Sequence, residues 1–483
     1  MSKLINFKIA SKVISRNLFI IAVSLLVCAV IAFYYSEKMM PFIFSSIIAL
    51  LLSVLFYLMT RKQNDEVKIN KKDAYFTVTF SWLIICLLGC LPYIFSGAIP
   101  SFINAFFESV SGFTTTGSSI LTDIEALPKS IIFWRSLTHW IGGIGIIVLV
   151  IIVMPSLQIG GYHLFTLESS SQEKIMPRIK TIGYRLLLIY IILTVVEILL
   201  LMAGNMNLYE SICHAFGTIA TGGFSPKNTS IAGYSPYIQY IIMIFMLLSG
   251  MNFVIHYYVL KRNFKKINEN EELKFYILVI LIIGLIVTIT LFFSMQKTLE
   301  ESFREAFFQV ISIITCTGYA TADYVQWPEF AWIIIFFAMF LGGSTGSTAG
   351  GIKMVRHLIL LKNIKIIFRK LLSPNAVLQV RLNKKSLSNK TNSSIMTFIT
   401  IYLMIFIIGS LLLVILGVDA KTASSSVATC MAGIGPGIGT VGPASNFAHL
   451  PDIGKVILTF LMLIGRLEIY TVIMLFSKSF WSK

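Results

Sequence analysis

The chain has 483 residues, of which 56% are hydrophobic and 13% are charged. A mean hydropathy of +0.82 lies outside the range of soluble domains and predicts a polytopic membrane protein. The formal net charge of +17 does not indicate nucleic-acid binding, because Lys and Arg cluster in alternate segments between the apolar runs, as they do in cytoplasmic loops. We therefore expect both termini to be cytoplasmic.

The first two apolar runs form a hairpin that stands outside the rest of the pattern. They cover about residues 13–35 and 42–60, each close to the length that crosses a bilayer. The first run has no small-residue cleavage site, so we expect a retained span and not a cleaved signal peptide. With the basic linker that follows, residues 1–72 form the predicted N-terminal unit.

Four similar units follow the hairpin. Each consists of a long apolar run, a short apolar helix, a loop of small residues and a second apolar run. The predicted repeats cover residues 73–181, 182–270, 271–391 and 392–483. The second runs of repeats 2 and 4 are expected to be spans at about residues 236–259 and 453–476. Because each repeat begins and ends at the basic side, the repeats are parallel, and a central pore is the natural product.

The loops of the four repeats are rich in Gly and Thr. Irregular backbone at membrane depth is tolerated only inside protein or beside a watery cavity. Glycine lets backbone carbonyls approach an axis, and rings of carbonyls can replace the hydration shell of K⁺. The loop cores hold no carboxylate, which a divalent-ion or proton path would favour. We therefore predict a site for a dehydrated monovalent cation; the alternative is a set of tight turns without an ion site.

The second span of repeat 3 is interrupted by ten small residues. They are Gly342, Gly343, Ser344, Thr345, Gly346, Ser347, Thr348, Ala349, Gly350 and Gly351. This break is the best candidate for a gate in the permeation path; a passive kink is the alternative. A phosphate-binding loop is excluded, because the order G-x-x-x-x-G-K-[ST] is absent.

Arg466 lies within the last apolar run. An arginine at membrane depth is costly and indicates function. We expect it to face the pore and pair with the glycine-rich break as an electrostatic barrier. A structural ion pair is the alternative, although Glu468 lies on a different helix face.

The loops, the run R-S-L-T-H-W-I-G-G-I-G-I-I-V-L from Arg135 and the run G-G-S-T-G-S-T-A-G-G-I-K-M-V-R from Gly342 resemble the Trk/Ktr/HKT superfamily of potassium transporters, and its TrkH branch in particular. The resemblance implies an all-α fold of four pseudo-symmetric span–pore-helix–span repeats in a homodimer. It also implies K⁺ uptake across a bacterial inner membrane, no enzymatic activity and no cofactor in this chain. Nucleotide would bind a cytosolic regulatory partner of the TrkA type. The glycine-rich break would be the intramembrane gating loop.

The resemblance assigns K⁺ contacts, mostly through backbone carbonyls, to the residues around one glycine in each loop. The expected filter residues are Thr115, Thr116, Gly117, Ala220, Thr221, Gly222, Cys316, Thr317, Gly318, Gly435, Pro436 and Gly437. In the family, glycine at all four positions accompanies K⁺ preference, and we place these glycines at Gly117, Gly222, Gly318 and Gly437.

Two other functions remain open at the level of sequence. One is a Na⁺-permeable or Na⁺- or H⁺-coupled transporter, which the loops do not distinguish from gated K⁺ diffusion. The other is a membrane enzyme, which would need acid, base or metal groups converging at one interface. The charged residues show no such grouping in the sequence, so transport is the preferred interpretation.

Overall fold

The structure is a computed structural model that describes residues 6–60, 71–148, 175–376 and 378–481. Within these ranges the chain is helical, apart from a hairpin of two short strands, β1 (Arg381–Leu382) and β2 (Lys385–Ser386). Six described helices are long and apolar enough to cross a membrane, and two bent helix pairs raise this number to eight. Most of the predicted basic linker after the hairpin, residues 61–70, lies outside the described residues, as does the end of the predicted second span of repeat 1.

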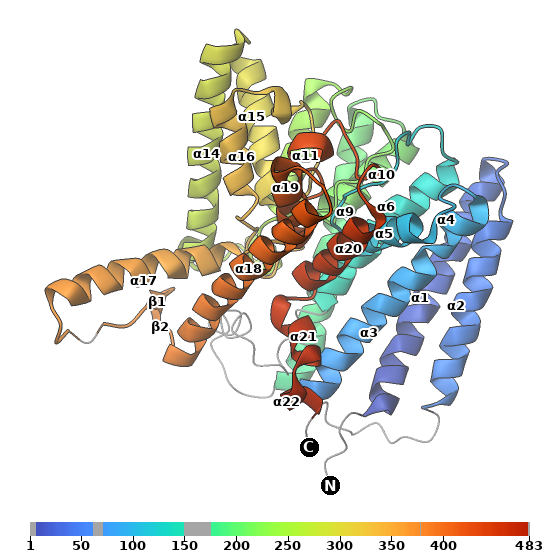
Figure 1. The fold of residues 1–483 in the computed structure, drawn as a ribbon, viewed down its shortest axis with the longest axis horizontal. Helices are drawn as coiled ribbons and strands as arrows, with labels where there is room; N and C mark the ends of the chain where they lie inside the picture. The colour runs from blue at the N-terminus through green and yellow to red at the C-terminus, as the bar shows by residue number, and fades with distance from the viewer. Residues whose placement is uncertain (1–5, 61–70, 149–174, 377, 482–483) are drawn as a thin grey trace.

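Helices α1 (Phe7–Tyr34) and α2 (Met40–Leu58) form the expected N-terminal hairpin at the edge of the molecule (Figure 1). Small residues bring the two helices close together. Ser15 and Ser53 each donate a hydrogen bond to the other's backbone carbonyl at 2.8 Å. Large apolar side chains point outward, and Phe33 is 70% exposed. Such a surface suits contact with lipid.

The order long helix, short helix, loop, second helix then occurs four times. The long helices are α3 (Lys71–Gly89), α9 (Ile175–Ala203), α14 (Glu271–Met295) and α18 (Asn389–Ile415). The short helices are α5 (Phe102–Phe113), α10 (Leu208–Ile219), α15 (Leu299–Ile314) and α19 (Ala420–Ala432). The second helices are α6 (Lys129–Val148), α11 (Pro236–Ser249), α16 (Glu329–Ala338) and α20 (Asp452–Arg466).

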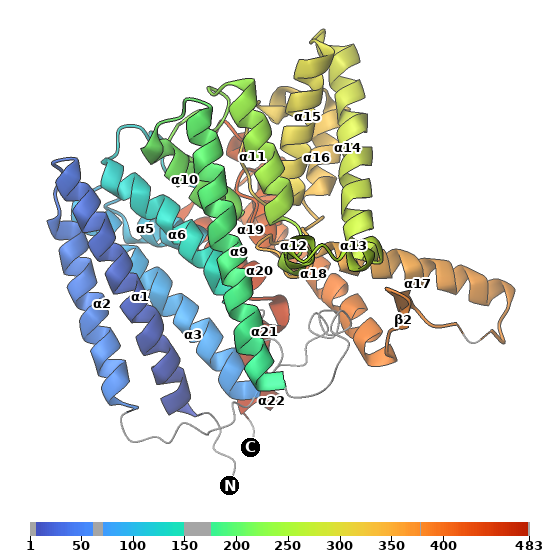
Figure 2. The same ribbon diagram turned by 180° about the vertical axis from the view of Figure 1, so that it is seen from behind.

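The repeats follow one another around a common centre. Repeat 4 lies in front of the molecule in Figure 1 and repeat 2 lies in front in Figure 2, with repeats 1 and 3 on opposite sides in both views. The beginning of α1 and the last helix, α22 (Lys478–Trp481), lie at the same end. The predicted boundaries at residues 182 and 392 fall inside α9 and α18.

Polar caps explain where three of the four short helices begin, α10, α15 and α19. Thr298 and Glu301 form a capping box at the start of α15, in which each side chain accepts the other residue's backbone N–H. The side chains of Asn207 and Asp419 accept backbone N–H groups at the starts of α10 and α19. Caps of this kind stabilise a helix by about 1 kcal/mol each.

The second spans of repeats 2 and 4 are bent, a feature that the sequence analysis did not predict. Helix α11 is followed by α12 (Phe253–Leu260) at 100°, and α20 is followed at 114° by α21 (Ile469–Ile473) and the turn after it. At the first bend, the carbonyl of Gly250 accepts the N–H of Ser344 from repeat 3 at 2.8 Å. The first bend therefore lies where the chain of repeat 3 contacts the break between α11 and α12, a partner that the local sequence does not reveal.

The second span of repeat 3 is broken, as predicted. Helix α16 ends at Ala338, and α17 (Met354–Leu372) begins after an irregular stretch and projects sideways from the molecule (Figures 1 and 2). The remaining short elements are α4 (Leu91–Ser96), α13 (Phe264–Asn268), η2 (Tyr324–Gln326), η3 (Gly439–Val441) and η4 (Met474–Phe476).

Candidate ion-permeation site

All four short helices end in loops with the same backbone conformation. A residue just after each helix is left-handed, with φ between +51° and +71°; these residues are Thr115, Thr221, Cys316 and Gly433. Two positions later a glycine has φ between +78° and +103°; these glycines are Gly117, Gly223, Gly318 and Gly435. The shared conformation makes the four loops equivalent although their sequences differ.

One backbone hydrogen bond also recurs in every loop. The residue between the two left-handed positions donates its N–H to the carbonyl five residues earlier, over 2.8 to 3.0 Å. The pairs are Thr116 with Ser111, Gly222 with Gly217, Thr317 with Ser312, and Ile434 with Thr429. Each loop is therefore anchored to the last turn of its own helix in the same way.

This geometry corrects the register expected for two loops. The sequence pattern aligned Gly222 and Gly437 with Gly117 and Gly318, but the backbone aligns Gly223 and Gly435 with them. The sequence alignment chose the glycine that directly follows Thr or Pro in each loop. The structurally equivalent position is instead the one with a positive φ, a conformation that favours glycine. Ala220 caps α10 behind its loop, and Pro436 and Gly437 come after the equivalent position in loop 4.

The four equivalent glycines form a closed ring, which we call the glycine ring. A Cβ at each glycine would meet the carbonyl oxygen just before the equivalent glycine of the next loop. The contacts join Gly117 to Gly222, Gly223 to Thr317, Gly318 to Ile434, and Gly435 to Thr116. Because the last contact returns to loop 1, the four loops close around one centre.

Backbone oxygen is the main ligand chemistry that these loops offer. Thr115, Thr116 and Thr317 are fully buried, and the loop cores contain no charged side chain. The carboxyl ends of the short helices lead into the ring, and a helix carries about half a negative charge at this end. The arrangement therefore suits a cation of low charge that sheds its water.

Residues 342–351, which we call the intramembrane loop, adjoin the ends of three short helices. The hydroxyl of Thr348 donates to the carbonyl of Ile219 at the end of α10, at 3.1 Å. A Cβ at Gly350 would overlap the carbonyl of Ala432 at the end of α19. A Cβ at Gly351 would lie 3.5 Å from the sulfur of Cys316, just after α15. The predicted gate residues thus lie next to the predicted filter.

Arg466 at the end of α20 reaches the intramembrane loop. Its Nη1 donates to the carbonyl of Thr348 at 2.6 Å, and the residue is 8% exposed. Its Nε and Nη2 have no hydrogen-bond partner among the described residues. Glu468 pairs instead with Arg356, at 2.7 Å. Among the described residues Arg466 forms no ion pair with an acidic side chain, so the alternative of a structural ion pair gains no support.

Sequence reasoning missed a residue that holds the intramembrane loop. The carboxylate of Glu272 in α14 accepts the N–H of Thr345 at 2.6 Å and that of Val355 at 3.2 Å. It thereby ties the loop to the start of α17. Nothing in the sequence distinguishes Glu272 from its neighbour Glu271, which pairs with Lys362.

The segments that lead from the glycine-containing loops of repeats 1 and 2 to α6 and α11 are joined by hydrogen bonds near Asn228. Its side chain accepts the N–H of Ile124 at 2.7 Å and donates to Asp123 at 2.8 Å. The hydrogen bond from Asn228 lowers the pKa of the Asp123 carboxyl, so this group is ionised at neutral pH. The contact adds a second link between repeats 1 and 2, away from the glycine ring.

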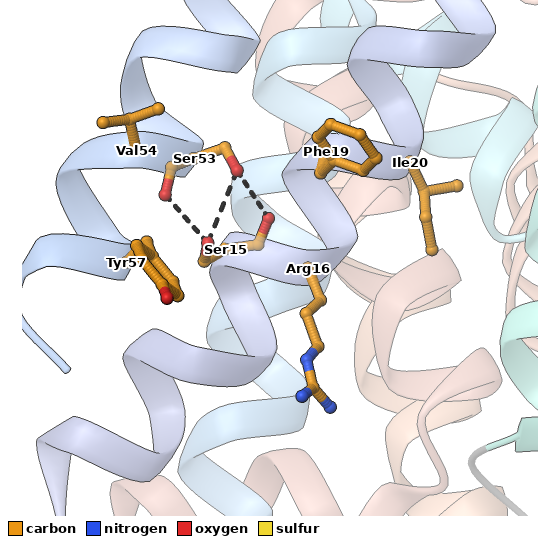
Figure 3. A pocket seen from close by; sticks show the side chains of 7 residues that line it. All are labelled: Ser15, Arg16, Phe19, Ile20, Ser53, Val54 and Tyr57. Atoms are coloured by element: carbon orange, nitrogen blue, oxygen red, sulfur yellow. Dashed lines mark hydrogen bonds between the residues drawn. The ribbon is translucent and has the colours of Figure 1, made fainter. Parts of the chain in front are cut away.

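An open groove of about 510 Å³ lies between α1 and α2, away from the glycine ring (Figure 3). Its lining is mainly apolar and consists of Ser15, Arg16, Phe19, Ile20, Ser53, Val54 and Tyr57. The groove belongs to the N-terminal hairpin, which contributes no residue to the four loops. We therefore place it outside the permeation site.

The sequence and the fold are similar to those of known proteins. Residues 38–483 match the TrkH family, described as a cation transport protein. The chain belongs to the TrkH family. As a TrkH-family chain it is a polytopic membrane protein for cation transport and not an enzyme.

The similarity to two potassium uptake proteins covers nearly the whole chain. It is 34% identical over 484 residues to the Trk system potassium uptake protein TrkH of Escherichia coli K12, covering 99% of both chains. It is 33% identical over 467 residues to the TrkG protein of the same strain, covering 95% of this chain and 96% of that one. The crystal structure of the potassium transporter TrkH from Vibrio parahaemolyticus superposes with a TM-score of 0.90 at 30% identity, covering 99% of this chain and all of that one.

Proposed function

We propose that this TrkH-family chain takes up K⁺ across a bacterial inner membrane through a channel-like path. The closed glycine ring carries this proposal, because four buried loops present backbone oxygens at one centre without a charged side chain. The names of the relatives, which are potassium uptake proteins, support the same substrate.

K⁺ contacts are assigned to the residues around each ring glycine. They are Thr115, Thr116 and Gly117 in loop 1, Thr221, Gly222 and Gly223 in loop 2, Cys316, Thr317 and Gly318 in loop 3, and Gly433, Ile434 and Gly435 in loop 4. This set keeps most of the residues expected from sequence and replaces Ala220, Pro436 and Gly437 by their structural equivalents.

The intramembrane loop and Arg466 are the proposed gate. Support comes from the contacts of Thr348 with Ile219 and with Arg466, which join the loop both to a short helix and to the last span. A guanidinium beside the path opposes a cation, so movement of the loop would change this barrier.

The proposed assembly is a homodimer with a cytosolic nucleotide-binding partner of the TrkA type, surrounded by membrane lipid. Both termini and the basic segments, including α17, are assigned to the cytoplasmic side by the positive-inside rule. The relatives are named as parts of a Trk system, which supports the presence of a partner. Nucleotide binding is assigned to that partner, and coupling to H⁺ or Na⁺ stays open.

The decisive experiment is cation flux into proteoliposomes that contain this chain alone. We expect K⁺ and Rb⁺ to enter at least about ten times faster than Na⁺, a difference of about 1.4 kcal/mol between the barriers. Empty liposomes provide the background rate. Equal Na⁺ and K⁺ flux would overturn K⁺ selectivity, and a flux that requires an imposed H⁺ or Na⁺ gradient would replace channel-like permeation by coupled transport.

A further inference from the structure

Each pair of neighbouring repeats is joined by a hydrogen bond from a side chain of one member to a backbone carbonyl of the other. The bonds are Arg135 Nη1 to Ser225 at 3.1 Å, Tyr319 to Phe224 at 3.2 Å, Tyr324 to Gly437 at 2.7 Å, and Ser118 to Gly435 at 3.0 Å. Among these four bonds, only the one between loops 1 and 2 has a charged donor.

The charge of Arg135 is balanced inside repeat 1. Its Nε donates to Glu108 Oε1 at 2.6 Å, and the two side chains are 2% and 0% exposed. The Glu108 carboxylate also accepts the hydroxyl of Ser119 and the N–H of Ile120, both at about 3.0 Å. Glu108 lies in the short helix α5, and Ser119 and Ile120 follow Gly117 closely. The Glu108 carboxylate therefore fixes the segment that follows loop 1 to the short helix that precedes it.

Arg135 extends this connection to loop 2. Its guanidinium carbon lies 3.5 Å from the centre of the Phe224 ring, and Phe224 directly follows ring glycine Gly223. One helical turn later, His139 stacks on the same ring at 4.0 Å. His139 Nδ1 also lies 2.7 Å from the carbonyl oxygen of Gly112 at the end of α5. Two side chains of α6 thus hold Phe224 and the end of α5 together.

We infer that Glu108 and Arg135 are specificity-determining positioning residues, which set the spacing between loops 1 and 2 of the glycine ring. A buried ion pair is weak support for stability, because desolvation offsets its attraction. Its hydrogen bonds instead fix both loops at once, and small changes in carbonyl spacing alter the discrimination between cations of different radius. The inference rests on the proposed function, since it concerns the selectivity of the same ring.

The test compares Glu108→Gln, Arg135→Gln and the double variant in proteoliposomes, with K⁺ and Na⁺ flux measured separately. Glu108→Gln leaves a buried cation beside the ring, so we expect K⁺ flux to fall about tenfold, the scale of coupling within one network. The double variant removes both charges. We expect it to recover K⁺ flux but to lose about tenfold in the K⁺/Na⁺ ratio.

Two further variants keep the inference testable if the double variant fails to fold. Arg135→Lys retains the charge but not the paired contacts to Glu108 and Ser225, and Phe224→Leu removes only the stacked ring. Both should retain flux and lose selectivity. The control is the double variant Glu300→Gln with Arg304→Gln. These residues form an ion pair at 2.8 Å in the short helix α15, and their other hydrogen bonds go to Tyr240 and Gln239, outside the four loops.

A normal K⁺/Na⁺ ratio in Arg135→Lys and Phe224→Leu would overturn the inference, as would an equal loss in the control. Failure of the proposed function is distinguishable, because it would appear in the unmodified chain as a K⁺/Na⁺ ratio near one. Size-exclusion elution and the thermal unfolding midpoint identify variants whose fold has changed.

Discussion

At the scale of single residues, the glycine ring depends on backbone dihedral angles more than on motif letters. In loop 4, Gly433 and Gly435 take the two left-handed positions, whereas Gly437 has an ordinary φ. A side chain at Gly435 would be strained by φ of +103° and would lie 3.0 Å from the Thr116 carbonyl. A Cβ at Gly437 would lie 2.8 Å from a methyl carbon of Val441 and 3.0 Å from the Ser425 hydroxyl, and its nearest contacts would include no atom of loops 1 to 3.

We predict that Gly435→Ala lowers the K⁺/Na⁺ flux ratio about tenfold, while Gly437→Ala changes it less than about threefold. Backbone strain of this kind is on the order of 1–3 kcal/mol, which is enough to displace the carbonyl of the ring. Flux in proteoliposomes measures both ratios. A larger effect at Gly437 than at Gly435 would restore the register expected from sequence.

Arg466 supports a second prediction at the same scale. Arg466→Gln removes a buried positive charge beside the intramembrane loop and the contact with the Thr348 carbonyl. We expect K⁺ flux to rise severalfold, because a lower positive potential reduces the barrier to a cation. The control is Arg369→Gln, on the exposed part of α17. Unchanged or reduced flux in Arg466→Gln would argue against an electrostatic barrier.

At the scale of elements, the two ends of the intramembrane loop in repeat 3 lie side by side. Leu341 and Ile352 form a backbone bridge, and the N–H of Gly342 donates to the Ile352 carbonyl at 2.8 Å. The two ends of the intramembrane loop therefore already meet. The residues between them contact the short helices and Arg466, so the loop is held by its surroundings more than by its own secondary structure.

Deletion of residues 343–350 should consequently raise K⁺ flux severalfold without unfolding the protein. The bridged ends can be joined with little movement of α16 or α17, and the contact with Ile219 disappears. Flux in proteoliposomes and the thermal unfolding midpoint provide the two measurements. Wild-type flux in a folded deletion variant would show that the loop is a passive kink.

At the scale of the whole molecule, the proposed topology places the loop that contains Glu125 and the β1–β2 hairpin on opposite sides of the membrane. Six native cysteines are all buried, so they give little background in labelling with thiol reagents. Glu125 in the outer loop and Lys384 beside the hairpin are 45% and 81% exposed. A cysteine at either position is therefore accessible.

We predict that a membrane-impermeant maleimide labels Glu125→Cys in intact spheroplasts and labels Lys384→Cys only after the membrane is opened. The expectation follows from the positive-inside rule, which assigns the basic segment around α17 to the cytoplasm. The unmodified chain serves as the background control. Labelling of Lys384→Cys in intact spheroplasts would invert the assigned topology.

The sequence by itself determined the class of protein, the hairpin, the four repeats and the location of the four loops. These features follow from local composition, since a run of about 20 apolar residues or a cluster of glycines can be recognised without knowledge of its neighbours. The break after α16 was visible for the same reason.

Only the tertiary structure decided the register of loops 2 and 4, the bends after α11 and α20, and the pairing of Glu108 with Arg135. Each of these depends on a partner distant in the chain. Gly435 is in register because it meets the Thr116 carbonyl, more than three hundred residues earlier, and α11 ends where the intramembrane loop of repeat 3 inserts. Hydrophobic periodicity records which face of a segment is buried, but it does not record which residue lies opposite.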